Sequence, residues 1–419
     1  MIDQLQAIRL QTDRQIAHWT LAANRLKLDD LASREAWDHL EQYLGVSLRR
    51  HLTGVINRLQ SEASALTAMQ RAAHTPTALA EVRRRLLTFR RQYLRTETTL
   101  DFFADAIKTR TNAHLAALLR ACDTLAYRSM SQLLDQIGKP TPVALTYVGE
   151  GIGASILKEG LRLWDGGELN PVAAIKIVRH NLLRPTALIH EAGHQMAHIA
   201  GWNEELAAVL SRGISGSSSG LADVWASWAS EIAADAFAFV HTGFASVAAL
   251  HDVLASDLPS VFRYIPGDPH PISYLRVLLG AETCKYFYGA GPWDTLAMSW
   301  TALHPLNYAP VDTRNLLEDS LPILKTVVRL TIDTPMRAFD GRPLRALIQP
   351  ERVSPTALDE LDKRIGPALF TSAHWLWTEP LRILALTGLQ LANRPRELND
   401  ILQLQEQSML RLGGTLQAA

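Results

Sequence analysis

Two histidines and a glutamate stand at metal-binding spacing in the segment HEAGH at residues 190–194. His190 and His194 are four residues apart, which on a helix places both imidazoles on one face, where they can hold one Zn²⁺. Glu191 is then set beside the ion, and its carboxylate can take a proton from a zinc-activated water and return it to a leaving amine. The pattern predicts a zinc site for amide hydrolysis. Two ordinary helix histidines are the alternative, because such a motif arises by chance in roughly one chain of this size in fifty.

Two histidines and a water leave a tetrahedral zinc one protein ligand short, so the hypothesis requires a third ligand elsewhere in the chain. Glu231 is the best candidate. It stands four residues before Asp235, in a helical segment at 221–240 whose tryptophan, phenylalanine and alanine content indicates burial, and a buried carboxylate needs a charged partner. With Glu231 on zinc, Asp235 is expected to accept the remaining ring N–H of His190 or His194.

Three other residues compete for the third ligand position. His198 continues the four-residue spacing, but by that point the helix has turned about 80° away from His190, so one ion is hard to share. We therefore expect His198 to support a ligand from behind or to belong to the core. Glu204 and Glu205 stand near the start of the next helix, where solvated capping residues are the default.

Three blocks, taken in order, resemble the gluzincin metallopeptidases, and most of all the family of the CAAX prenyl endopeptidase and the heat-shock membrane peptidases. The first is HEAGH at 190–194, and the second is EIAADAFA at 231–238, similar to that family's ExxAD followed by an aromatic residue. The third is HPISYLR at 270–276, an HP pair followed five residues later by arginine. The resemblance covers roughly residues 140 to 300.

This resemblance implies a ligand set of His190, His194 and Glu231, with Glu191 as the general base and Asp235 holding a ligand histidine. It also implies that His270 donates a hydrogen bond to the oxyanion of a tetrahedral intermediate, a contribution of about 2.7 to 4 kcal/mol. Arg276 is expected to orient Asp235 or a loop, with a plain structural salt bridge as the alternative.

Composition narrows the classes of partner. Forty-two basic side chains balance 42 acidic ones, so no overall field gathers nucleic acid or anionic lipid. The most apolar windows, at about 186–210 and 221–250, contain several charged residues that would be costly in lipid, which argues against a membrane span. Two distant cysteines in no CxxC arrangement, and an N-terminus without signal-peptide character, favour a cytoplasmic protein.

The pattern along the chain predicts an α+β fold that is predominantly α. Residues 1–137 read as a helical N-terminal domain with an arginine-rich helix, interpreted as a solvated surface rather than a binding face. Residues 138–305 read as a zincin-like metallopeptidase domain with a small β-sheet, and residues 306–419 as a helical C-terminal extension. The segment at 171–179 is expected to be an edge strand that pairs with an extended peptide substrate. Pro185 and Gly201 suit the two ends of the helix that carries HEAGH.

The sequence therefore predicts a zinc-dependent metallopeptidase that acts on a peptide or protein substrate. The helical flanks are expected to offer a surface for a protein partner or for self-association. Two alternatives stay open: a helical scaffold protein with a structural or regulated zinc site, and a zinc hydrolase of a non-peptide amide. Glu191 argues against the scaffold alternative, because a structural zinc site does not need a carboxylate beside an open coordination position.

Overall fold

The structure is a computed structural model that describes residues 4–149, 155–156, 172–214 and 219–415. Most of these residues are helical and three short strands form one small sheet, so the fold is predominantly α with a minor β part, as predicted. The chain divides into two compact units, Met1–Thr111 with Leu157–Ala174, and Asn112–Ile156 with Ile175–Ala419. None of the described helices is both long enough and apolar enough to cross a lipid bilayer.

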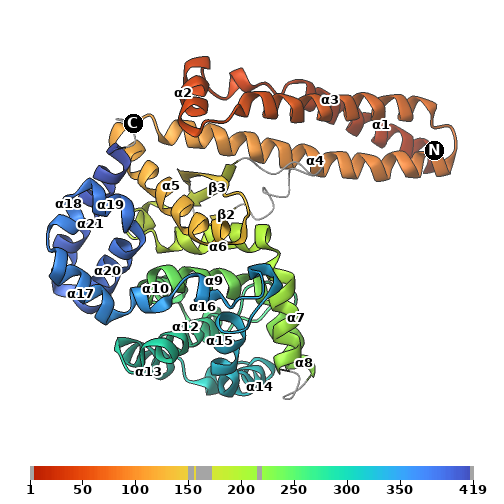
Figure 1. The fold of residues 1–419 in the computed structure, drawn as a ribbon. Helices are drawn as coiled ribbons and strands as arrows, with labels where there is room; N and C mark the ends of the chain where they lie inside the picture. Colours follow the sequence, from red (N-terminus) through yellow and green to blue (C-terminus); the bar gives the residue numbers. More distant parts are fainter. Residues whose placement is uncertain (1–3, 150–154, 157–171, 215–218, 416–419) are drawn as a thin grey trace. The chain divides into compact units, whose positions relative to one another are not determined.

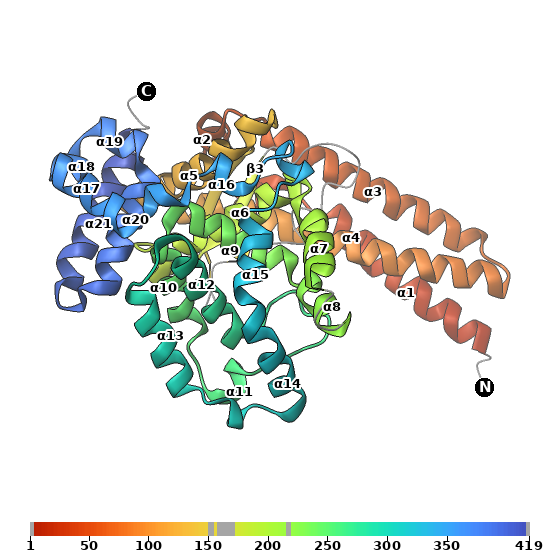
Figure 2. The same ribbon diagram turned by 60° about the horizontal axis from the view of Figure 1, so that its bottom comes forward.

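The first unit is built from long helices, drawn red to orange in Figure 1. Three of them, α1, α3 and α4, run side by side in both views (Figures 1 and 2) and bury a shared apolar core that includes Ile16, Leu66 and Phe89. The arginine-rich helix is α4, and its arginines are exposed, which agrees with a solvated surface and does not by itself exclude a binding face: Arg83, Arg84, Arg85, Arg90, Arg91 and Arg95. The bounds of the helices are α1 Gln4–Asn24, α2 Arg34–Leu44, α3 Leu48–Ala72 and α4 Pro76–Thr109.

The second unit carries the HEAGH motif and most of the sheet, because residues 172–174 at the start of the strand β3 are grouped with the first unit. Its first half consists of α5 Ala113–Leu134, β1 Val143–Val148, β2 Ser155–Ile156, β3 Val172–Ile177, α6 Thr186–Ala200, α7 Trp202–Ile214, α8 Ser219–Ser227, α9 Ala229–Thr242, α10 Phe244–Leu254 and α11 Leu258–Val261. Its second half consists of α12 Ser273–Tyr288, α13 Pro292–Leu303, α14 Val311–Ser320, α15 Leu324–Ile332, α16 Leu344–Leu347, α17 Pro355–Ile365, α18 Ala368–Thr371, α19 Ala373–Thr378, α20 Pro380–Asn393 and α21 Leu398–Thr415.

The sheet has the strand order β1-β3-β2, and β2 pairs antiparallel with β3, with Ser155 opposite Lys176. The prediction of an edge strand at 171–179 is therefore wrong, because β3 has a neighbour on each side. The expectation rested on the position of this strand just before the motif helix, and that position does not determine which strands flank it in the sheet.

The observed units differ from the boundaries expected at residues 137 and 305. Helix α5 packs against β1 and α6, and α21 packs against α5 in turn. Figure 1 shows these blue C-terminal helices beside α5. Helix α20 also contacts α9 and α10. The segment after residue 305 therefore belongs to the same compact unit as the motif helix, because its apolar faces complete that unit's core.

Candidate metal centre

The helix α6 presents both motif histidines from one face. It follows Pro185 and ends at Gly201, whose φ of 74° is the left-handed conformation that commonly stops a helix. The Nε2 atoms of His190 and His194 lie 3.1 Å apart, and the two rings meet edge to face. The four-residue spacing therefore converges two imidazole nitrogens on one point, as the sequence predicts.

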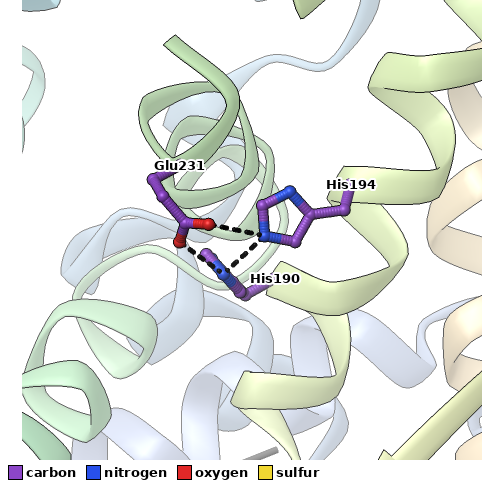
Figure 3. A group of neighbouring side chains, drawn as sticks. All are labelled: His190, His194 and Glu231. Atoms are coloured by element: carbon purple, nitrogen blue, oxygen red, sulfur yellow. Dashed lines mark hydrogen bonds and ion pairs between the residues drawn. The ribbon is translucent and has the colours of Figure 1, made fainter. Parts of the chain in front are cut away.

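The carboxylate of Glu231 completes the group from α9. Its Oε2 lies 3.4 Å from Nε2 of His190, and its Oε1 lies 3.3 Å from Nε2 of His194 (Figure 3). The side chain of Glu231 is only 2% exposed, so these contacts are shielded from water. Within the described part of the chain, these three residues are the group whose ligand atoms could hold a metal ion.

The donor set and its spacing fit zinc. Two imidazole nitrogens and one carboxylate oxygen are ligands that zinc prefers, and ligand atoms about 2.05 Å from a tetrahedral ion lie about 3.3 Å from one another. The contacts between these residues measure 3.1 to 3.4 Å, with Oε2 of Glu231 facing His190 and Oε1 facing His194. One ligand atom from each residue lies within 4.8 Å of the other two, so the three residues are placed to ligate one ion.

The segment 221–240 was interpreted as one continuous helix, but the structure divides it into α8 and α9 at Trp228. The indole of Trp228 packs edge to face on Trp225, whose ring N–H donates to the hydroxyl of Ser320. The break places Glu231 in the first turn of α9. The backbone N–H groups of Glu231 and Ile232 both donate to the carbonyl of Trp228 there.

Both histidines have a polar neighbour at their other ring nitrogen. Nδ1 of His190 lies 2.8 Å from Oδ1 of Asp235, one turn after Glu231 on α9. Nδ1 of His194 lies 3.3 Å from the hydroxyl of Ser230. Sequence reasoning placed Asp235 in this role and missed Ser230, although its position directly before the third ligand was a signal that could have identified it.

Arg276 on α12 joins both carboxylates of α9. Its guanidinium donates to the two oxygens of Asp235, from Nε at 2.6 Å and from Nη2 at 2.8 Å. The same Nη2 lies 3.1 Å from Oε2 of Glu231. The expected contact with Asp235 is therefore present. The contact with Glu231 was not predicted, because the sequence does not show which face of α12 is turned toward α9.

The ionisation of these groups reflects their mutual contacts. Burial would raise the pKa of the Asp235 carboxyl, but Arg276 and His190 outweigh it and lower this pKa to about 2. Burial is likewise outweighed at Glu231, where Arg276 and the two histidines hold the pKa well below its ordinary value. Burial would lower the pKa of His190, but Asp235 and Glu231 raise it to about 9. The site therefore favours positive charge where the ligand nitrogens converge.

Glu191 is buried on α6 directly after the first ligand histidine. Its charge contributes, after those of Asp235 and Glu231, to raising the pKa of Arg276. When both histidines are neutral, as metal binding requires, three carboxylates and one guanidinium give this cluster a formal charge of −2, which a divalent cation would neutralise. The charge of the cluster and its ligand set thus point to the same kind of ion.

His270 lies at the rim of the centre, on the segment between α11 and α12. Its Nε2 is 3.7 Å from Oε1 of Glu231, while its side chain is 56% exposed. Asp268 accepts from both the ring Nδ1 of His270, at 2.6 Å, and its backbone N–H, at 3.0 Å. Sequence reasoning missed Asp268, for which the signal is the spacing of two residues in DPH, since an aspartate readily bonds the backbone N–H two residues on.

The rival ligands lie elsewhere. His198 is exposed, so the expectation that it would support a ligand or fill the core is wrong. One further helical turn carries it past the face that packs on α9. The oxygens of Glu205 accept from the backbone N–H groups of Arg337 and Ala338, and Glu204 is exposed.

Comparisons with protein-family models, curated proteins and solved structures returned no match for this chain.

Proposed function

We propose that this chain is a zinc-dependent metallopeptidase that hydrolyses peptide bonds with Glu191 as the general base. The proposal is carried by one observation: Nε2 of His190, Nε2 of His194 and the carboxylate of Glu231 converge within hydrogen-bonding distances at a buried site. The order of HEAGH, EIAADAFA and HPISYLR supports it through their resemblance to the gluzincin peptidases. The zincin-like character of the catalytic unit is part of the same proposal.

Each residue has a defined task in this reaction. A zinc ion held by His190, His194 and Glu231 supplies polarisation of a carbonyl and activation of water. The carboxylate of Glu191 accepts the proton of the attacking water and delivers it to the leaving nitrogen. His270 donates from Nε2 to the carbonyl oxygen as negative charge develops there. Asp268, bonded to the opposite ring nitrogen, orients the imidazole for this donation.

A structural zinc site is the rival from a different class of protein. Such sites are closed by four protein ligands, whereas the described residues bring three ligand atoms together. A buried glutamate next to the first ligand is also costly to a purely structural site, because it adds a negative charge that zinc binding by three ligands does not need. Both features favour hydrolysis.

Profiling of cleavage products with wild type and Glu191→Gln tests the proposal. The variant keeps the size of the side chain but loses the base, so we expect normal zinc content and a loss of cleavage of at least 10²-fold. Glu204→Gln, an exposed glutamate on the neighbouring helix, is the matched control and should cleave like wild type. Unchanged cleavage in Glu191→Gln refutes the base role, and products from amides but not peptides would redirect the proposal to a non-peptide substrate.

A further inference from the structure

Arg276 stands behind the metal centre rather than in it. It lies in the first turns of α12 and is buried. Besides its two bonds to Asp235, its Nη2 lies 3.1 Å from Oε2 of Glu231 and 3.5 Å from Nε2 of His190. Nη2 of Arg276 therefore contacts Nε2 of His190, Oε2 of Glu231 and the carboxylate of Asp235 that lies beside His190.

We propose that Arg276 is a positioning residue with two effects on the metal centre. It keeps the two carboxylates of α9 assembled in the metal-free protein, and by holding Oε2 of Glu231 it would disfavour ligation of a metal ion through both oxygens of this carboxylate. The inference rests on the metal centre proposed above, and it goes beyond that proposal by assigning how the site is organised before and during metal binding.

Two carboxylates on α9 stand close to one another. Glu231 and Asp235 are four residues apart, so their like charges face one another on one side of the helix and repel. Both are held away from bulk water, and an unpaired buried charge destabilises the folded state strongly. Arg276 contacts both carboxylates at hydrogen-bonding distance. In the metal-free protein it supplies a positive charge that zinc would otherwise have to provide.

The two oxygens of Glu231 have different neighbours. Oε2 lies 3.1 Å from Nη2 of Arg276 and 3.4 Å from Nε2 of His190, whereas Oε1 faces Nε2 of His194 at 3.3 Å and Nε2 of His270 at 3.7 Å. A carboxylate with one oxygen committed to a guanidinium ligates through the other. Ligation through one oxygen leaves a fourth tetrahedral position open for water or substrate, which a catalytic zinc site requires. Without Arg276 neither oxygen is held by the guanidinium, so ligation through both becomes possible.

The test compares Arg276→Met and Arg276→Lys with wild type, in metal-free and zinc-loaded forms. In Arg276→Met we expect the melting temperature of the metal-free protein to fall by on the order of 10 °C, because a buried ion pair is broken. Zinc should restore most of this loss, since it neutralises the same carboxylates. Replacement of zinc by Co²⁺ reports ligand geometry, and the visible bands of the variant should weaken relative to wild type as Glu231 changes to two-oxygen ligation.

Arg314→Met is the matched control. Arg314 is a half-buried arginine on α14 whose guanidinium bonds the backbone carbonyls of Leu306, Asn307 and Ala309. Its removal should lower the melting temperature equally with and without zinc and leave the Co²⁺ spectrum unchanged. If Arg276→Met behaves in the same way, Arg276 is an ordinary structural salt bridge and the proposal is wrong.

Arg276→Lys decides the case if the methionine variant does not fold. Lysine keeps the charge but cannot bond both carboxylates in the arginine geometry, so we expect a folded metal-free protein with an altered Co²⁺ spectrum. A wild-type spectrum in this variant overturns the positioning role. A wild-type protein that binds neither zinc nor Co²⁺ would instead overturn the metal centre itself, so the two failures are distinguishable.

Discussion

Gly193 of α6 and Ala234 of α9 meet where the two ligand-bearing helices pack together. A Cβ atom on Gly193 would lie 3.1 Å from Cα of Ala234 and 3.1 Å from Cβ of Phe237, closer than such atoms normally approach. The absent side chain therefore lets α9 come close enough for Glu231 to reach the histidines of α6. The glycine of HEAGH therefore permits the short distance between α6 and α9, and this distance brings the carboxylate of Glu231 to the histidines of α6.

Enlarging Gly193 should weaken zinc binding without changing any ligand. We expect Gly193→Val to push α9 away from α6, to lower zinc affinity at least tenfold and to destabilise the fold by about 1 to 3 kcal/mol. Competition with a chelator measures the affinity, and urea unfolding measures the stability. Gly54→Ala on α3, where an added Cβ meets nothing within 4 Å, should leave zinc affinity unchanged. Wild-type affinity in Gly193→Val would show that the helices tolerate a larger separation.

Removal of the Ser230 hydroxyl should reduce metal affinity through His194. The hydroxyl lies 3.3 Å from Nδ1 and orients the ring, and loss of such supporting contacts typically costs 10- to 100-fold in affinity. We expect Ser230→Ala to show this loss in a chelator competition. Ser227→Ala, an exposed serine whose hydroxyl bonds only the backbone carbonyl of Val224 in the described contacts, is the control. Equal affinity in both variants would mean that the ring of His194 is held by packing alone.

The group that could hold a metal ion could be predicted from sequence because its spacing is local. His190 with His194, and Glu231 with Asp235, each lie one helical turn apart, so a helix of any tertiary context presents each pair on one face. The pairing of α6 with α9 also had a signal, since a tetrahedral ion demands a third ligand. These two constraints together specify most of the centre.

The contacts made across elements could not be predicted in the same way. Arg276 reaches Glu231 because of the rotation of α12 about its axis, and β3 has neighbours on both sides because of the order of strands in the sheet. Both depend on long-range packing, which single-sequence periodicity does not encode. The break at Trp228 was missed for a related reason, since the packing of two indoles overrides a sequence that favours one continuous helix.

Asp268 and His270 should affect turnover without affecting metal content. If His270 donates to the developing oxyanion, His270→Ala should lower kcat by about 10²- to 10³-fold. Asp268→Ala should give a smaller loss, because the imidazole remains but is no longer held at Nδ1. Steady-state kinetics on a peptide substrate, with zinc analysis of each variant, measures both effects. A rise in KM with unchanged kcat would place His270 in substrate binding instead.

His241 provides a pH-dependent stability that is independent of the metal centre. It is buried near the end of α9, and burial lowers its pKa from 6.5 to about 3, with the positive charge of Arg352 acting in the same direction. The folded state therefore holds the neutral imidazole. Its contribution to stability is fully present above about pH 6.5 and is lost as pH falls from 6.5 toward 3.

Urea unfolding between pH 7.5 and pH 5 measures this loss. One such histidine should lower the free energy of unfolding by up to about 1.4 kcal/mol per pH unit below 6.5. His241→Phe removes the titrating group, so its stability should fall less steeply with pH than that of wild type, even if its stability at pH 7.5 is lower. His374→Gln, an exposed histidine in the same unit, should keep the wild-type slope. Parallel slopes for wild type and His241→Phe would show that the buried ring is protonated without cost, through local opening of the end of α9.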